Sequence, residues 1–196
     1  MDQSLYRKLE QEIIEMLRTK IPSDVPYHNV EHTKDVCAAA ERLGRLESVN
    51  EHDLLLLKTA ALFHDTGYVV ARSEHEERSC EIARERLSAE NVLADEIEQV
   101  CKLILATRVP QRPATHLEEI LCDADLDYLG RDDFQEISDK VFAEFQTFGV
   151  VHDRQEWQQL QVKFFETHHY FTPSAIRLRQ QKKEENLSVI RNTLTV

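Results

Sequence analysis

The chain has 196 residues and a formal net charge of -12, and 31% of its residues are charged. This length predicts one domain with a substantial core, because a globular domain usually holds roughly 100 to 200 residues. The acidic balance argues against binding to a nucleic-acid polymer, which usually requires a basic face. No apolar segment reaches the roughly 18 residues that a bilayer-spanning helix needs, so no membrane partner is expected.

The N-terminal segment MDQSLYRKLEQEIIEML predicts a cytoplasmic protein. It interleaves acidic with apolar residues, whereas a secretory signal peptide has a basic start and an uninterrupted apolar stretch. The four cysteines lie far apart and form no CxxC pair; they are Cys37, Cys80, Cys101 and Cys122. They are expected to be reduced core residues, not parts of a zinc ribbon or a redox motif.

Apolar residues recur at spacings of three and four along nearly the whole chain, and only four glycines and five prolines interrupt them. This pattern predicts an all-α protein with short loops. The first helix is expected to have Ser4 as its N-cap and to be ended by Pro22 and Pro26. The second helix is expected to begin just after Pro26, with His32 on its core-facing side and His28 one turn earlier.

The third helix is the most apolar segment of the chain. It is expected to start near Asn50 and to present the adjacent pair His64 and Asp65 in its last turn, where Gly67 suits a left-handed C-terminal cap. Two capping boxes, each a Ser or Thr followed three residues later by Glu, predict the starts of later helices. These boxes are Ser73 with Glu76 and Thr115 with Glu118.

The helix behind Thr115 is expected to reach Asp125 and to break near Gly130. Two apolar stripes follow and predict two further helices. The stripes are Phe134, Ile137, Val141 and Phe145, and then Trp157, Leu160, Phe164 and His168. Thr172 and Pro173 form a good cap and first turn for the last helix.

Two imidazoles and two carboxylates from three segments make a candidate metal site, namely His32, His64, Asp65 and Asp125. Imidazole nitrogen and carboxylate oxygen suit Mn, Fe, Zn, Ni or Mg, and the lack of cysteine ligands argues against soft ions. Four protein ligands in octahedral geometry leave positions for water or substrate, as a catalytic metal requires. Water activated by the metal is then the expected nucleophile toward phosphorus.

Several neighbouring residues have two interpretations. Asp123 and Asp127 flank Asp125 at offsets of two and point elsewhere on a helix, so Asp125 is favoured as the last ligand and Asp123 is the nearest alternative. His28 is a candidate to protonate a leaving oxygen next to His32, and its alternative is a hydrogen bond to the backbone or contact with water.

His75 is a candidate for proton transfer or for a second metal ion, whereas Glu76 is explained by its capping box. The candidate phosphate-binding cations are Arg108, Arg112, Arg177, Arg179, Lys182 and Lys183. Arg108 is favoured as the substrate-binding residue because its helix ends close in sequence to the metal-bearing segment. His168 and His169 are candidates for a pocket wall, although a satisfied core histidine is the commoner case for His168.

These residues resemble the HD superfamily of metal-dependent phosphohydrolases, whose members carry a histidine, an adjacent His-Asp pair and a distant aspartate on a helical scaffold. The resemblance covers roughly residues 27–130 and implies that His32, His64, Asp65 and Asp125 hold the metal. Thr107 stands where proteins of this family with two fully liganded metals would have a further histidine.

The segment YHNVEHTKDV also resembles the YHNxxHxxDV segment of class I cyclic nucleotide phosphodiesterases. This likeness implies that His28 donates a proton to the leaving group. HDTGY is similar to the stretch that follows the His-Asp pair in these families. The chain is shorter than the phosphodiesterase catalytic domain and has no clear counterpart of its purine-clamping glutamine and phenylalanine, so cyclic nucleotide specificity is not implied.

The expected fold is one all-α HD-type domain over residues 1–196, with a metal-binding core at about 27–130 and C-terminal helices at 131–196. The expected function is a metal-dependent phosphatase or phosphodiesterase that cleaves a phosphomonoester or phosphodiester of a small molecule, with a nucleotide as the favoured substrate. Its expected catalytic residues are His28, Asp65 and His75. The alternative is a non-catalytic, metal-containing module that senses a nucleotide. The sequence leaves open the substrate, the metal and its number, and the oligomeric state.

Overall fold

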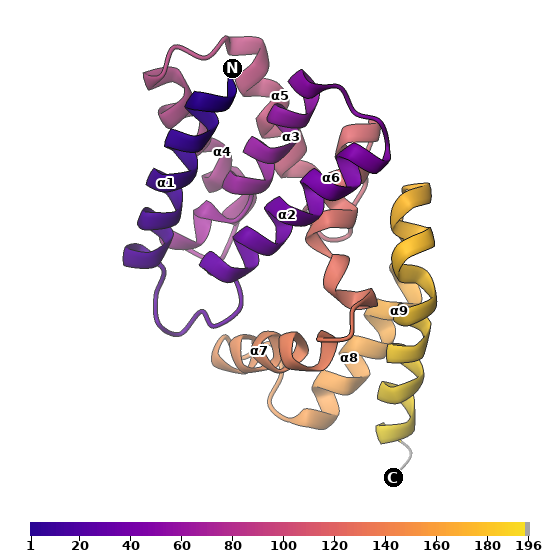
Figure 1. Cartoon of the computed structure of the whole chain (residues 1–196). Coiled ribbons are helices and arrows are strands. Elements are labelled where there is room, and N and C mark those ends of the chain that lie inside the picture. Colours follow the sequence, from indigo (N-terminus) through magenta and orange to yellow (C-terminus); the bar gives the residue numbers. More distant parts are fainter. Residues whose placement is uncertain (195–196) are drawn as a thin grey trace.

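The computed structural model describes residues 1–194, and all of their regular structure is helical (Figure 1). The helices are α1 (Gln3–Lys20), α2 (Val30–Leu46), α3 (Glu51–Phe63), η1 (Thr66–Val69), α4 (His75–Ala89), α5 (Ala94–Ala106), α6 (His116–Asp125), η2 (Asp127–Gly130), α7 (Phe134–Thr147), α8 (Arg154–Thr167) and α9 (Pro173–Leu194). The labels η1 and η2 denote short 3₁₀ helices. The predicted all-α fold is therefore confirmed. No helix in residues 1–194 combines the length and apolar character needed to cross a membrane.

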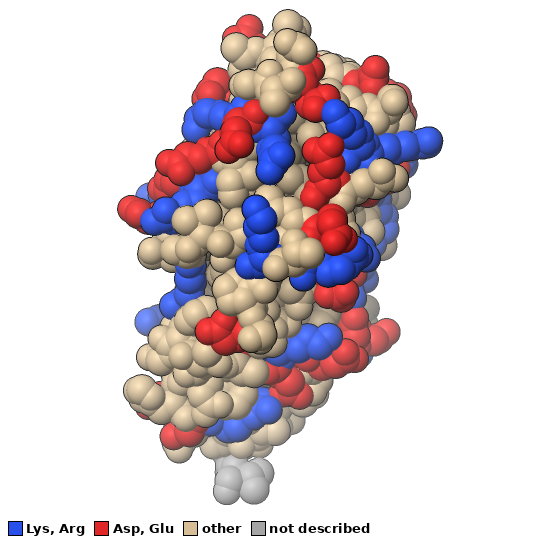
Figure 2. Space-filling view, turned by 90° about the vertical axis from the view of Figure 1, so that its left-hand side faces the viewer, with Lys and Arg blue, Asp and Glu red and all other residues tan. Residues whose placement is uncertain are grey.

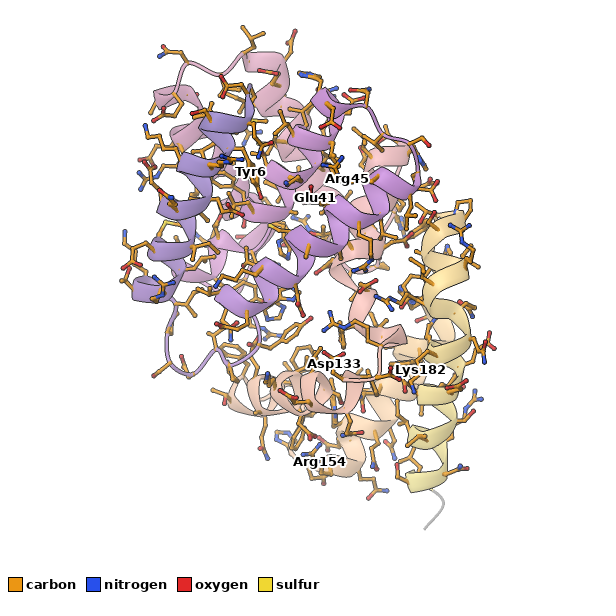
Figure 3. All side chains as sticks on the ribbon, in the orientation of Figure 1. Tyr6, Glu41, Arg45, Asp133, Arg154 and Lys182 are labelled. Carbon is orange, nitrogen blue, oxygen red and sulfur yellow. The ribbon has the colours of Figure 1, made fainter. Side chains whose placement is uncertain are left out.

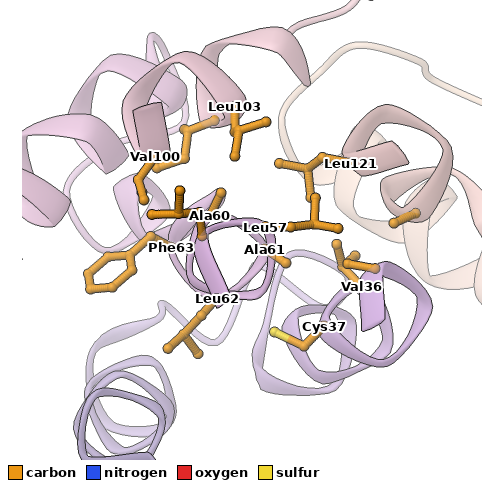
Figure 4. Close-up of a cluster of buried hydrophobic side chains, with 14 of the residues drawn as sticks. Val36, Cys37, Leu57, Ala60, Ala61, Leu62, Phe63, Val100, Leu103 and Leu121 are labelled. Carbon is orange, nitrogen blue, oxygen red and sulfur yellow. The ribbon is translucent and has the colours of Figure 1, made fainter. Parts of the chain in front are cut away.

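Helix α3 lies at the centre of the main core. Its sequence is apolar on all sides, which predicts a buried helix, and Leu56, Leu57, Ala60 and Phe63 are all fully buried. Figure 4 shows side chains of α3 packed against neighbouring helices in several directions. His64, which follows the last residue of this helix, is therefore held in place by the packing of α3.

The helices form two groups (Figure 1). Helices α1 to α6 enclose the main core around α3, and α7, α8 and α9 pack with η2 around two smaller apolar clusters. Tyr27, from the loop before α2, packs in one of these smaller clusters against Val141 and Trp157. The chain segment that precedes α2 therefore contacts both groups. All four cysteines are buried and free of disulfide bonds.

Several helix starts differ from their predictions. Asp2, not Ser4, caps α1, because its side chain accepts a hydrogen bond from the backbone N–H of Leu5 at 2.9 Å. The predicted Ser73–Glu76 capping box is wrong, since α4 begins behind Glu74, which has a positive φ of 54° and makes no side-chain cap. Thr115 and Glu118 do form the predicted box at the start of α6.

The start of α2 changes the environment of His28. The helix does not begin just after Pro26, because Asn29 caps it and accepts hydrogen bonds from the N–H groups of Glu31 and His32. Asn29 favours this role because its short amide can bond the free N–H groups of a first turn. His28 therefore lies in the loop before the cap and not on the helix.

Gly67 does not form the predicted left-handed cap of α3. Helix α3 ends at Phe63, and Gly67 lies within η1, outside the positive-φ region. A side chain at this position would collide with the carbonyl oxygen of His75, and the Gly67 N–H donates to Ser79 Oγ at 2.8 Å. The glycine is therefore needed for close packing of η1 on α4.

Surface charges pair locally. Glu41 accepts hydrogen bonds from Lys58 at 2.7 Å and Arg45 at 2.9 Å, and Figure 3 shows Glu41 and Arg45 close together on α2. On the face in Figure 2, acidic and basic side chains are interleaved. Exposed pairs such as Glu41–Arg45 contribute little to stability, roughly 0 to 1 kcal/mol each. On that face no single sign of charge gathers in one broad patch.

Asp123 joins α6 to the start of α9. It is fully buried, and its carboxylate accepts hydrogen bonds from the N–H groups of Phe171 and Thr172, both at 2.8 Å, and from the Thr172 hydroxyl at 2.7 Å. These donors occupy both carboxylate oxygens. Asp123 therefore anchors the C-terminal helix, which argues against its alternative role as the last metal ligand.

The replacement Asp123→Ala should lower the free energy of unfolding by about 3 kcal/mol, because three donors lose a buried acceptor. Urea denaturation followed by circular dichroism measures this loss. Asp132→Ala is the matched control, since the Asp132 side chain is 95% exposed and its removal should cost at most about 0.5 kcal/mol. Equal stabilities of the two variants would contradict the anchoring role.

Candidate functional site

The four predicted ligands converge at one point. His32 comes from the first turn of α2, His64 and Asp65 follow α3, and Asp125 ends α6. The Nε2 atom of His32 lies 3.2 Å from Nε2 of His64 and 3.3 Å from Oδ1 of Asp125. One ligand atom each from His32, His64 and Asp125 lies within 4.8 Å of the others, so these three residues could hold a metal ion.

Asp65 completes this group. Its Oδ2 atom is buried and lies 3.0 Å from Nε2 of His64 and 3.2 Å from Nε2 of His32, yet it has no hydrogen-bond partner among residues 1–194. A buried carboxylate oxygen without a partner is costly unless a cation compensates it. The donor set of two imidazoles and two carboxylates therefore fits a divalent cation.

The backbone orients His64 toward this point. Its Nδ1 atom lies 2.8 Å from the carbonyl oxygen of Ala61, which fits a donated hydrogen bond and leaves Nε2 as the acceptor. Burial acts to lower the pKa of His64, but the carboxylates of Asp65 and Asp125 outweigh it and raise the pKa well above its usual value. Burial acts to raise the pKa of Asp65, and the histidines hold it well below its usual value. The site therefore favours positive charge.

His28 pairs with a residue that the sequence did not single out. Glu144 on α7 is fully buried, and its Oε1 atom contacts Nδ1 of His28. Its other oxygen accepts hydrogen bonds from the N–H groups of Tyr27 at 2.9 Å and His28 at 3.1 Å. On its far side the His28 ring stacks on Tyr68 with ring centroids 4.3 Å apart. The imidazole is thus held from two sides, with Nε2 left for a ligand.

Burial acts to raise the pKa of Glu144, but the hydrogen bonds and charge of His28 lower it below its usual value. One sequence signal could have identified this residue. Glu144 lies three positions after Val141, so it falls on the apolar stripe that predicted α7. A carboxylate on a core-facing stripe requires a buried partner, but 116 residues separate Glu144 from that partner.

His75 lies beside Asp65 at the start of α4. Its Nε2 atom is 3.4 Å from Oδ1 of Asp65 and 3.5 Å from Oε1 of Glu76, and its Nδ1 atom lies 3.1 Å from the Arg72 carbonyl oxygen. Burial acts to lower the pKa of His75, and the Asp65 carboxylate raises it above its usual value. Thr107 stands where HD superfamily proteins with two fully liganded metals would have a further histidine. Its hydroxyl makes a local hydrogen bond, donated to the Ile104 carbonyl oxygen at 2.8 Å.

A cleft of about 1110 Å³ opens from this point between the two helix groups. One end is lined by polar residues, among them His28, Asp65, His75 and Asp125. The opposite wall is apolar and comes from α7, α8 and the loop between them. This wall, named here the aromatic wall, consists of Val141, Phe145, Phe148, Val150, Trp157, Leu160, Phe164 and Phe165. Such a combination is typical of small-molecule sites.

Arg108 lines the cleft, but its guanidinium contacts Glu77 and lies 3.7 Å from Glu76. The other candidate cations and the two late histidines do not line it. These residues are Arg112, Arg177, Arg179, Lys182, Lys183, His168 and His169. Arg179 is held by two hydrogen bonds to Asp127, at 2.7 and 3.0 Å. The structure therefore brings only one of the predicted cations to the cleft.

The family model of the HD domain matches residues 29–127, just over half of the chain. Two solved structures share the fold, each with a TM-score of 0.63. One, a predicted HD superfamily hydrolase from an uncultured Thermotogales bacterium, is 22% identical, and the match covers 94% of this chain and 91% of the other. The second, Bacillus subtilis YpgQ in complex with ADP, is 20% identical, with 94% and 95% covered. None of the curated proteins matches the chain.

The family match includes all four residues of the candidate metal site, His32, His64, Asp65 and Asp125. It confirms the predicted resemblance to the HD superfamily, whereas the local likeness to cyclic nucleotide phosphodiesterases stays a prediction. The two solved structures bear on the fold alone, because their sequence identities are low. On the family match, the chain belongs to the HD domain family.

Proposed function

We propose that the protein is a metal-dependent phosphohydrolase that cleaves a phosphomonoester or phosphodiester of a nucleotide. One observation carries this proposal: Oδ2 of Asp65 lies buried between two imidazoles at the polar end of a large cleft, with no hydrogen-bond partner in the described part of the chain. A structural site would have no need of a cleft of this size. Membership of the HD domain family and the likeness of the fold to an HD superfamily hydrolase support a hydrolase.

His32, His64, Asp65 and Asp125 would hold the divalent ion. When bound, such an ion polarises a phosphoryl oxygen and makes water more acidic. The side chains around the site would position the attacking water and the groups that transfer protons. Asp65 is suited to orient the attacking water as well as to hold the ion, because within residues 1–194 its Oδ2 has no hydrogen-bond partner, and His75 lies 3.4 Å from its other oxygen. We assign to His75 a supporting role in proton transfer.

His28 is proposed to give a proton to the leaving oxygen. Its Nδ1 contacts the buried Oε1 atom of Glu144, which orients the ring. The stack on Tyr68 fixes the ring plane. A site that only stored a metal ion would not need this buried acid and imidazole beside it. Glu144 therefore acts as a positioning residue for His28.

The cleft suits a nucleotide because it joins a phosphate-binding end to an apolar end. Phosphate groups fit the metal site, and a planar base fits the aromatic wall, where rings such as Trp157 and Phe164 offer stacking partners. The structure of YpgQ in complex with ADP supports a nucleotide ligand for a protein of this fold. A sensor that binds a nucleotide without turnover is the competing function.

Replacing His64 with Ala should weaken divalent-metal binding at least about 100-fold, because one of two imidazole ligands is lost. Elemental analysis of the protein after dialysis against Mn, Zn, Fe or Ni measures the amount of bound metal. His152→Ala, which changes an exposed histidine outside the cleft, is the control and should keep the ion. Equal metal contents would contradict the assigned site.

Metal affinity should also fall as the pH drops from about 8 to about 6. The carboxylates raise the pKa values of His32 and His64, so both rings hold protons more tightly than usual and must release them before an ion can bind. Titration calorimetry in two buffers of different ionisation enthalpy measures the released protons. An affinity that did not vary with pH would contradict ligation by these imidazoles.

The manganese-loaded protein should release phosphate, pyrophosphate or nucleoside from at least one class of nucleoside monophosphates, triphosphates or cyclic nucleotides. Asp65→Ala should reduce that rate at least about 1000-fold while the helical circular dichroism signal persists. If every nucleotide class stayed intact but bound to the protein, the sensor function would replace the proposed one.

Replacing His28 with Ala should lower kcat roughly 100- to 10000-fold without loss of metal, since a positioned proton donor contributes this much. Glu144→Gln should lower kcat roughly 10- to 100-fold, again at full metal content. The control is Glu136→Gln, on the exposed face of the same helix, where the side chain is 74% exposed. Wild-type rates in both site variants would refute the assigned proton donor.

A further inference from the structure

Arg72 is the cation in the cleft whose charge has no partner. It lies in the loop between η1 and α4 and lines the cleft. Its guanidinium lies over two rings of the aromatic wall, 5.0 Å from the centroid of Phe148 and 5.6 Å from that of Phe145. Within residues 1–194, no carboxylate forms an ion pair with it. Its positive charge is therefore balanced only by ring faces and solvent.

Arg108 differs in this respect, although it is the other Arg or Lys side chain among the described residues that line the cleft. Its guanidinium contacts Glu77 and approaches Glu76 to 3.7 Å. An anion that bound Arg108 would compete with both carboxylates. Arg72 has no such competitor, and an aromatic face holds a guanidinium in place without neutralising its charge.

The backbone of Arg72 lies next to the residues that border the metal site, and its guanidinium lies over the aromatic wall. The ring of Tyr68 stacks on His28 at 4.3 Å and packs on His75 at 4.5 Å, and these two histidines border the metal end. The Arg72 backbone adjoins these rings, since its carbonyl oxygen lies 3.1 Å from Nδ1 of His75. A ligand that reaches both the metal site and Arg72 must extend past the phosphoryl group at the metal.

We propose that Arg72 binds a second phosphoryl group of the substrate, next to the one placed at the metal site. This inference rests on the proposed function and narrows its substrate class to nucleotides with at least two linked phosphates. The negative charge of a polyphosphate would otherwise face Glu74, Glu76 and Glu77, which also line the cleft. A guanidinium without a carboxylate partner offsets that repulsion and can bind phosphate through two parallel hydrogen bonds.

Equilibrium dialysis of the manganese-loaded protein against AMP and against α,β-methylene ADP tests this inference without hydrolysis of the phosphate link. Arg72→Met keeps an apolar side chain over the rings and should weaken binding of the diphosphate about 10- to 100-fold, the range for one charge-assisted phosphate contact. Binding of AMP should change at most about threefold. Arg72→Lys keeps the charge but loses the two parallel hydrogen bonds. Its affinity for the diphosphate should lie between those of the wild type and Arg72→Met.

Two arginines serve as comparisons. Arg86→Met changes an arginine of α4 outside the cleft and should leave both affinities unchanged. Arg108→Met should weaken binding of the diphosphate less than Arg72→Met does, because the charge of Arg108 is already paired with Glu77. An equal loss of affinity for AMP and for the diphosphate would show that Arg72 contacts a part that both ligands share. This result would overturn the inference.

The outcomes separate this inference from the proposed function. Selective loss of diphosphate binding, in a protein that hydrolyses no nucleotide, would keep the second phosphate site and reject the hydrolase. Hydrolysis of a nucleotide with unchanged diphosphate binding in Arg72→Met would keep the hydrolase and reject the second phosphate site. Failure of the wild-type protein to bind the diphosphate more tightly than AMP would also overturn the role of Arg72.

Discussion

A buried carboxylate oxygen without a hydrogen-bond partner, Oδ2 of Asp65, is the constraint on which the site depends. It lies within 3.2 Å of Nε2 of both His32 and His64. A buried carboxylate oxygen without a hydrogen-bond donor costs free energy. The neighbouring imidazoles offset part of this cost, since they hold the pKa of Asp65 well below its usual value against the effect of burial, and the surrounding structure holds the group in place. Helix α3 is packed on all sides, and η1 turns directly after Asp65 and packs closely on α4 through Gly67. The stability of the main core therefore maintains an arrangement that is unfavourable without a cation.

Three buried carboxylates have different tasks because their neighbours differ. The oxygens of Asp123 are occupied by donors from the start of α9, so this residue joins two parts of the fold. Glu144 divides its oxygens between the backbone before α2 and the ring of His28. Asp65 alone keeps an oxygen for a ligand. All three are buried carboxylates, and the donors that surround each one distinguish their environments.

The cleft combines contributions from both helix groups. Helices α2, α3 and α6 bring the candidate metal ligands, and α7 and α8 bring the aromatic wall and the buried glutamate. Although the whole chain is acidic, with a net charge of -12, a single unpaired guanidinium at Arg72 changes the local balance, because charges interact strongly at short range in a partly enclosed site. The inference about Arg72 therefore rests on local charge pairing and not on the net charge of the chain.

Apolar periodicity and the His-Asp pair are local signals, so the helical fold, the buried character of α3 and the candidate ligands His32, His64 and Asp65 could be predicted from the amino-acid sequence alone. Which of Asp123 and Asp125 faces the histidines follows from the folded structure, since neighbouring aspartates differ only in the donors that folding brings to them. The same holds for Glu144 and Arg72. The partner of Glu144 lies 116 residues away along the chain. Arg72 is distinguished by having no carboxylate ion-pair partner among the residues that the structure describes, which no spacing of residues encodes.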